Sequence, residues 1–153
     1  MKKKFFILVC IIIIIVIIII PSKPHLKIIS YENNISSEAS INGWRWTYNK
    51  ASGNSNLGIG DFELASKINA IKIPKGTTIS MKTSICKNFT KNYNNIKKID
   101  MYLLDTDIKQ LKKIDIDSLE LMLPEKEGIY SYAIEVYWDE QHHIRYVFKV
   151  ECV

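Results

Sequence analysis

The strongest candidates for metal ligands are two adjacent histidines, His142 and His143, which follow Asp139 and Glu140. Imidazole and carboxylate groups both bind zinc, but neighbouring residues of an extended segment point to opposite sides. No Cys or third His is placed to join them. We therefore expect residues 139–143 to form a solvated hairpin loop, with no metal bound.

Other side chains that could do chemistry also lack the spacing that chemistry needs. Asp105-Thr106-Asp107 and Asp115-Ile116-Asp117 offer paired carboxylates, but neither has the glycine and closing glutamate of an EF-hand loop. The serines include no G-x-S-x-G segment, and no Cys–His arrangement has a matching context. We therefore expect no cofactor and no catalytic residues, and the chain is predicted not to be an enzyme.

Two cysteines could be joined if this part of the chain lies outside the cytoplasm, where disulfides form. Cys152 is in phase with Phe148 and Val150 and faces inward, whereas Cys86 is out of phase with the strand that precedes it. A bond needs Cα atoms within about 7 Å of each other. The pair Cys86 and Cys152 is a candidate disulfide, and two free thiols are the alternative.

A cluster of aromatic residues opens the first predicted strand. Trp44 and Trp46 share one face, and Arg45 lies on the other. One interpretation is that the in-phase aromatics build the core. The other is that Trp44, Arg45 and Trp46 form a binding surface for a peptide or glycan, on an edge strand that can pair with an extended partner.

The N-terminus carries an unbroken apolar run, Phe5–Ile20, preceded by Lys2, Lys3 and Lys4. As a helix it would be about 24 Å long, against a hydrocarbon core of about 30 Å. No pair of small residues marks a signal-peptidase site after it. We expect residues 1–20 to be an uncleaved signal anchor, with the lysines cytoplasmic and the rest of the chain outside.

A lipoprotein anchor at Cys10 is a weaker alternative, because Val9 stands where a lipobox needs a small residue. The lysines also account for most of the charge. The net charge is +5, with 21 basic and 16 acidic groups. Without the three N-terminal lysines the remainder is close to +2, and it has no basic stripe with interleaved aromatics. We therefore expect no nucleic-acid partner.

After a predicted tether over residues 21–39, residues 40–153 alternate between short apolar runs and turn residues. Six segments have the period of two that is typical of strands. They are Ile41–Tyr48, Thr77–Ile85, Ile99–Leu104, Ile114–Leu123 with a phase slip near Ser118, Ile129–Trp138 and Ile144–Cys152. Lys50–Gly60 is predicted to be a loop, and Asp61–Ala70 and Asp105–Lys113 fit either a helical turn or a loop. The pattern predicts an all-β sandwich.

The C-terminal part resembles immunoglobulin-like domains. Tyr130 follows Gly128 just past an acidic turn, which is similar to the tyrosine corner, whose hydroxyl bonds back to the backbone. More broadly, the chain resembles small membrane-anchored extracytoplasmic proteins of Gram-positive bacteria with an Ig-like domain. The residues that carry this resemblance are Trp44-Arg45-Trp46, Pro124, Gly128, Tyr130, Tyr132, Ile134, Trp138 and Tyr146–Val150.

The resemblance implies a single-pass location in the cell membrane and an Ig-like fold, but it supplies no activity. We expect a non-enzymatic binding or interaction module of the cell envelope, held to membrane lipid by its N-terminal helix. Its partner would be an envelope protein, a peptide or a wall polymer. The alternative is an inhibitor or immunity-type protein that acts on a secreted enzyme or toxin, and it would present a rigid exposed loop.

Overall fold

The computed structural model describes residues 23–48, 51–56, 60–84 and 95–153, and the side chains of residues 46–56 lie outside this description. The predicted signal anchor over residues 1–20, with Lys2, Lys3 and Lys4, also lies outside it, as does Cys86. Within the described ranges, no helix combines the length and the apolar character needed to cross a bilayer.

The described chain is mostly β-structure with one short helix. The strands are β1 (Leu26–Ser30), β2 (Ile35–Glu38), β3 (Ser40–Tyr48), β4 (Ala51–Asn56), β5 (Ile71–Ile73), β6 (Thr78–Thr83), β7 (Lys98–Asp105), β8 (Gln110–Ile114), β9 (Glu120–Met122), β10 (Gly128–Asp139) and β11 (His142–Cys152). The helix α2 (Asp61–Lys67) lies between β4 and β5.

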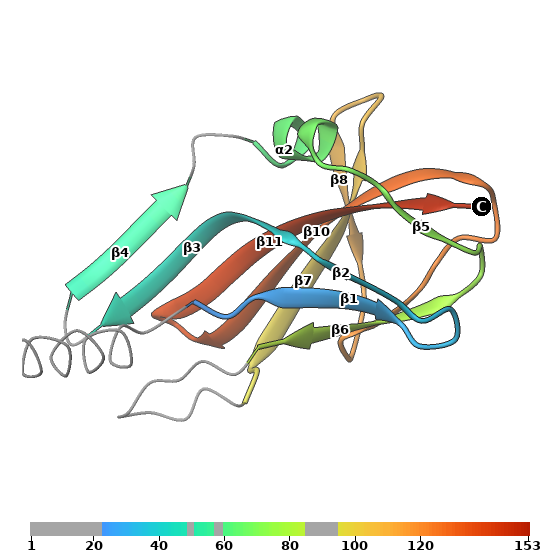
Figure 1. The fold of residues 1–153 in the computed structure, drawn as a ribbon. Helices are drawn as coiled ribbons and strands as arrows, with labels where there is room; N and C mark the ends of the chain where they lie inside the picture. The colour runs from blue at the N-terminus through green and yellow to red at the C-terminus, as the bar shows by residue number, and fades with distance from the viewer. Residues whose placement is uncertain (1–22, 49–50, 57–59, 85–94) are drawn as a thin grey trace, which may run out of the picture.

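Two sheets pack against each other in a sandwich-like fold (Figure 1). The smaller sheet has the order β2-β1-β6-β9, and we call it sheet A. The larger, sheet B, has the order β4-β3-β11-β10-β7-β8, with β5 pairing in parallel with the far end of β11. The main core lies between the sheets, since it joins buried residues of β1 and β6 to those of β10 and β11.

The longest hairpin shows why these residues form strands. Alternate side chains of β11 are buried from Ile144 to Cys152, and the facing residues of β10 are buried in the same phase. The rings of Tyr132 and Phe148 stack across the hairpin with their centroids 5.2 Å apart. A period of two with one apolar face is what a half-buried strand requires. The predicted strands at 129–138 and 144–152 are confirmed.

The structure differs from the expected tether. Residues 26–38 form β1 and β2, because Leu26, Ile28 and Ser30 alternate toward the core and are fully buried or nearly so. The hydroxyl of Tyr146 donates a buried hydrogen bond of 2.7 Å to the carbonyl of Pro24. Two inward apolar residues, Leu26 and Ile28, were too weak a pattern to predict a strand, and their burial depends on the facing sheet.

Two other segments differ from their predictions. β4 forms inside the predicted loop Lys50–Gly60 and pairs with β3, so β4 rather than β3 lies at the edge of sheet B. The predicted hairpin loop over residues 139–143 is a tighter turn, with His142 already in β11. A sequence of Ser, Gly and Asn has low strand propensity, and the pairing of β4 is decided by its neighbour.

The two ambiguous segments are also decided. Asp61–Ala70 begins with α2, whose Ala65 packs on the outer face of sheet B against Leu104, Ala133 and Val147. In Asp105–Lys113, a turn follows Asp105 and leads directly into β8 at Gln110. The carboxylate of Asp105 accepts hydrogen bonds from the backbone N–H groups of Asp107 and Ile108, at 3.2 and 3.3 Å. This carboxylate therefore holds the turn of the β7–β8 hairpin.

Candidate functional site

The structure places Trp44 and Arg45 of the predicted aromatic surface on opposite faces of β3. Trp44 packs against the main core and also lies under the ammonium of Lys23, 3.9 Å from the ring centroid. Arg45 projects from the opposite face of β3, beside its register partner His143. The side chain of Trp46 lies outside the described residues. The expectation that β3 is an exposed edge is wrong, because β4 covers it.

Arg45 belongs to a row of polar and aromatic residues that crosses the outer face of sheet B. Register pairs place Arg45 beside His143, His143 beside Tyr137, and Tyr137 beside Lys98. The rings of Tyr137 and His143 meet edge to face at 5.1 Å, and the Lys98 ammonium lies 5.0 Å from the Tyr137 ring. The four residues belong to four different strands, so the row cannot be recognised from the sequence alone.

The next row on the same face centres on a charge cluster of Asp61, Glu135 and Arg145. The Arg145 guanidinium donates from Nε to both carboxylate oxygens of Asp61, at 3.1 and 2.9 Å, and from Nη1 to Glu135 at 3.4 Å. Burial alone would lower the pKa of Arg145, but the hydrogen bond and charge of Asp61, with the charge of Glu135, raise it overall. The cluster joins α2 to sheet B across a large sequence separation.

A β-bulge completes this cluster. The register of β11 and β3 shifts between Arg145 and Tyr146, and Asn42 lies at the shift. Its amide donates a hydrogen bond of 2.5 Å to Asp61, while its side-chain oxygen is buried without a hydrogen-bond partner among the described residues. Because Arg145 bridges the two carboxylates and Asn42 donates to Asp61, the cluster has the properties of a structural clamp.

The side chains of the adjacent histidines lie on opposite sides of β11. His142 is buried, and its Nδ1 lies 2.7 Å from the Asp139 carboxylate. His143 faces the other side of the strand, with Nε2 3.9 Å from Glu135. The described part of the chain contains no group of three or more His, Cys, Asp or Glu side chains that could hold a metal ion. The two rings point apart as predicted, but His142 is not solvated.

The side chain of Tyr130 makes a hydrogen bond back to the backbone of the preceding turn. The Tyr130 hydroxyl donates to the carbonyl of Lys126 at 3.0 Å, between β9 and β10. Gly128 adopts a φ of 151°, and a side chain there would contact the Tyr130 ring. Glycine is needed at that position because other residues rarely adopt such a φ. Tyr130 therefore closes the turn before β10.

The candidate disulfide is only half described. Cys152 is buried at the end of β11, and burial raises the pKa of its thiol. Cys86 lies outside the described residues, so the bond between them stays a prediction. The inward direction expected for Cys152 is confirmed by its place in the main core.

A pocket of about 320 Å³ opens where the edge of β11 is left uncovered. β3 pairs with β11 as far as Val147, and β5 begins to pair at Val150. Phe148 and Lys149 therefore have a strand partner only on the β10 side within the described residues. This gap between two neighbouring strands was not predicted, because it depends on where β3 and β5 leave the sheet.

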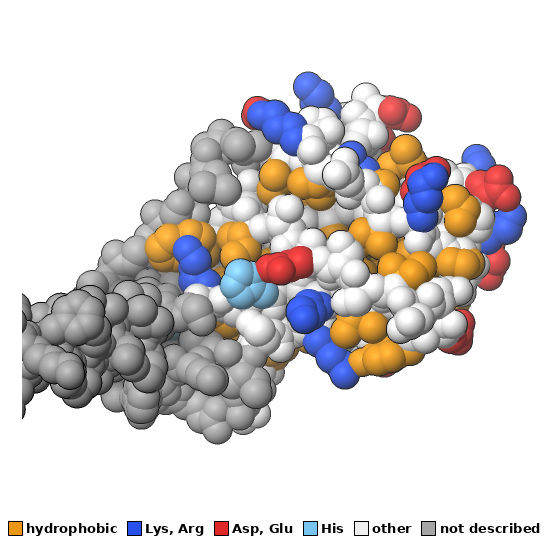
Figure 2. Space-filling model, in the orientation of Figure 1, with side chains coloured by type: hydrophobic (Ala, Val, Ile, Leu, Met, Phe, Trp, Pro, Cys, Tyr) orange, Lys and Arg blue, Asp and Glu red, His pale blue; other side chains and the backbone are white. Residues whose placement is uncertain are grey.

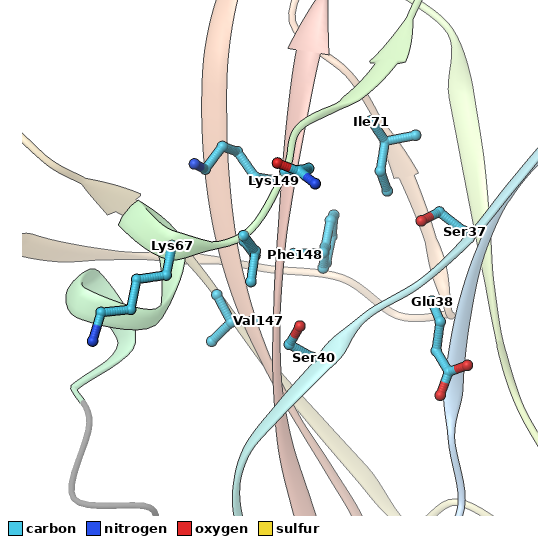
Figure 3. A pocket seen from close by; sticks show the side chains of 10 residues that line it. Ser37, Glu38, Ser40, Lys67, Ile71, Val147, Phe148 and Lys149 are labelled. Carbon is cyan, nitrogen blue, oxygen red and sulfur yellow. The ribbon is translucent and has the colours of Figure 1, made fainter.

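The pocket has an apolar floor and a polar rim. Figure 3 shows Ser37 and Ile71 directed toward Phe148, while Lys67 and Glu38 extend away from the centre. Both charges have partners elsewhere. The Glu38 carboxylate is hydrogen-bonded to the His25 ring, and the Lys67 ammonium donates to Glu63 at 2.7 Å. Lys149 forms no ion pair with a described residue, so its positive charge on the rim is not compensated there.

These features give the pocket a definite chemistry. Small ligand sites are usually concave, with an apolar lining and a few polar groups that fix orientation. Hydroxyl groups of Ser37 and Ser40 supply hydrogen bonds, and Lys149 supplies a positive charge.

Comparison of the chain with protein-family models, with curated proteins and with solved structures finds no match.

Proposed function

We propose that the chain is a membrane-anchored Ig-like binding module of the cell envelope. The strand order supports the Ig-like part. In sheet A, β1, β6 and β9 correspond to strands A, B and E, and in sheet B, β11, β10 and β7 correspond to G, F and C. Tyr130 then lies at the start of strand F, after the E–F connection, where a tyrosine corner belongs.

In this correspondence β2, β3, β4 and α2 form an insertion between the first strand and β5. The insertion adds β2 to one sheet and β3 and β4 to the other. The pocket lies at the point where the insertion ends and β5 begins, so it is a feature of this chain rather than of the Ig-like framework. Loops and insertions on a rigid framework are where binding sites concentrate.

The observation that carries the binding function is the uncovered edge of β11 inside the pocket. Extended peptides bind to free strand edges through main-chain hydrogen bonds, with adjacent pockets providing selectivity. The gap at Phe148 and Lys149 offers such an edge, and Lys149 offers a partner for a carboxylate. We propose that the ligand is a short extended peptide that bears a carboxylate.

A peptide array tests this proposal with the full-length chain in detergent micelles. The array carries tetrapeptides with acidic, amide, basic and apolar side chains, each with a free or an amidated C-terminus. We expect selective binding of peptides with a carboxylate, and a roughly tenfold weaker signal for Lys149→Glu because the charge is reversed. Lys112→Glu on the exposed edge strand β8 is the matched control.

Absence of any binding above background, or equal binding by the Lys149→Glu variant, would contradict the peptide proposal. Binding that depends on basic rather than acidic peptides would contradict the assignment of Lys149 as the recognising charge. The folded state of each variant is checked by circular dichroism, so that loss of binding is not confused with loss of structure.

One observation favours the alternative function, an inhibitor of a secreted enzyme or toxin. The β7–β8 hairpin presents Ile108, which is 61% exposed, on a turn held by the Asp105 carboxylate. A rigid exposed loop is what an inhibitor inserts into a cleft. The turn between β10 and β11 is shorter. Substituting Ile108→Asp would abolish inhibition but leave peptide binding at the pocket unchanged.

A further inference from the structure

We infer that the folded domain is held directly against the bilayer, with the end of the sandwich that carries Lys23 and Trp44 facing the lipid headgroups. The inference rests on the proposed membrane anchor and adds the orientation of the domain to it. The occupant of this end is a phospholipid surface, because the apolar run ends only a few residues before the chain enters the fold at Pro24.

The chain enters the fold immediately after the apolar run. The run ends at Ile20, and Pro24 is already fixed by the buried hydrogen bond from Tyr146. The intervening residues 21–23 span at most about 11 Å when fully extended. A folded domain of this size has a radius of gyration of about 14 Å. The connection is therefore too short for the domain to turn freely above the bilayer.

Further contacts fix this start of the chain. The Lys23 ammonium lies over the Trp44 ring, and the backbones of His25 and Ser84 are linked by a hydrogen bond of 2.8 Å. Ala39 donates a backbone hydrogen bond of 2.9 Å to Leu26. With β1 held from both sides, the domain is rigidly joined to its point of entry, and one end must face the membrane.

That end contains the start of β1, the end of β3, the β10–β11 turn and the start of β7 (Figure 1). Figure 2 shows hydrophobic, basic and histidine side chains together there. Aromatic and lysine side chains are the groups that favour the membrane interface. Among the described residues at this end, the four basic groups are offset by four carboxylates. The basic residues are Lys23, Arg45, Lys97 and Lys98, and the acidic residues are Glu38, Asp100, Asp139 and Glu140.

Two consequences follow from the balanced charge and the short connection. Docking depends on the anchor rather than on anionic lipid, so neutral phosphatidylcholine is sufficient and salt does not release it. The pocket also takes a fixed height. Ile144 is the register partner of Trp44, and Phe148 lies four residues farther along β11. Phe148 is therefore about 13 Å farther from the membrane than Ile144. The ligand is then membrane-proximal.

Fluorescence quenching tests the orientation in the full-length chain. The background chain carries Cys10→Ala and Cys86→Ala, which remove two of the three native cysteines. A single cysteine is introduced by Lys97→Cys, near the docking end, or by Lys126→Cys, at the opposite end beyond β9. Each is labelled with a fluorophore and reconstituted into phosphatidylcholine vesicles that contain a headgroup nitroxide lipid. The background chain should take up no label, because Cys152 is only 2% exposed.

We expect roughly threefold stronger quenching at position 97 than at position 126. Insertion of twenty Gly and Ser residues between Ser22 and Lys23, with an end-to-end distance of about 25 Å, should remove the difference. If the chain sediments with vesicles but both positions are quenched equally, the orientation is wrong and the anchor stands. If the chain stays in the supernatant, the anchor and the orientation are both overturned.

Discussion

The two faces of sheet B are built on different principles. The inner face is an apolar layer in which alternate residues are buried from Tyr132 to Trp138 in β10 and from Ile144 to Cys152 in β11. The outer face is divided between the apolar contact with α2 and two rows of charged and aromatic side chains. The inner face depends on a local period of two, whereas the outer face depends on residues brought together from distant segments.

The largest effect should come from the inner face. Phe148→Ala removes a fully buried ring that stacks on Tyr132, and we expect a loss of about 3–5 kcal/mol in the free energy of unfolding. Lys149→Ala, one residue along on the other face, should cost about 0.5 kcal/mol or less. Guanidinium denaturation of both variants measures the contrast. Similar losses for the two variants would remove the distinction between the faces.

The charge cluster should give the next largest effect. Arg145→Met leaves the nearly buried carboxylate of Asp61 without its guanidinium, and we expect a loss of about 2–3 kcal/mol, reduced by the partial exposure of the pair. Because apolar groups can replace a buried ion pair, the double variant Arg145→Met with Asp61→Leu should recover much of this loss. A single variant as stable as the parent would show that the clamp contributes nothing.

A smaller loss should follow from Tyr146→Phe, which tests the connection of the inner face to the N-terminal segment. The substitution keeps the ring but leaves the carbonyl of Pro24 without its buried donor. We expect about 1–2 kcal/mol, measured by the same denaturation. Hydrogen exchange should also increase at β1 more than at β10. Unchanged exchange at β1 would mean that Tyr146 does not hold this segment.

Tyr130→Phe should have a weaker effect because its hydrogen bond is close to solvent. We expect a loss of about 1 kcal/mol through release of the turn at Lys126. Thermal unfolding monitored by circular dichroism measures it. A loss as large as that of Phe148→Ala would indicate that Tyr130 belongs to the core rather than to the turn.

A pH titration gives the smallest effect and compares one tyrosine on each face. Burial raises the pKa of Tyr132, and burial with the nearby Glu135 carboxylate raises that of Tyr137. A raised pKa in the folded state contributes stability that is present below about pH 10, the unfolded value, and is lost as the pH rises above it. Glu135→Gln should lower the pKa of Tyr137 but leave that of Tyr132 unchanged, as followed by ultraviolet absorbance.

The inner face was largely predictable. Alternation in residues 129–138 and 144–152 identifies both the strands and their buried sides, because a period of two has one geometric meaning in a sheet. The hydrogen bond of Tyr130 was also expected from its place after Gly128. β1 was not predicted as part of the sandwich, and β4 was expected to be a loop, because their pairing depends on neighbours distant in sequence.

The candidate site was less predictable than the fold. Arg45 lies on the outer face of sheet B, but Trp44 packs against the core. The pocket arises because β3 leaves β11 after Val147 and β5 joins it only at Val150. No local pattern encodes the place where one strand ends against another.

The sequence by itself determined the apolar N-terminal run, the β-rich character of the rest and the inward faces of its longest strands. These properties follow from composition and local period, which a single segment carries. Only the tertiary structure decided which strands are neighbours, how Asp61 meets Arg145 and where the edge of β11 is open. Such features require segments far apart in the chain to meet, and the free energy that selects them comes from their mutual burial.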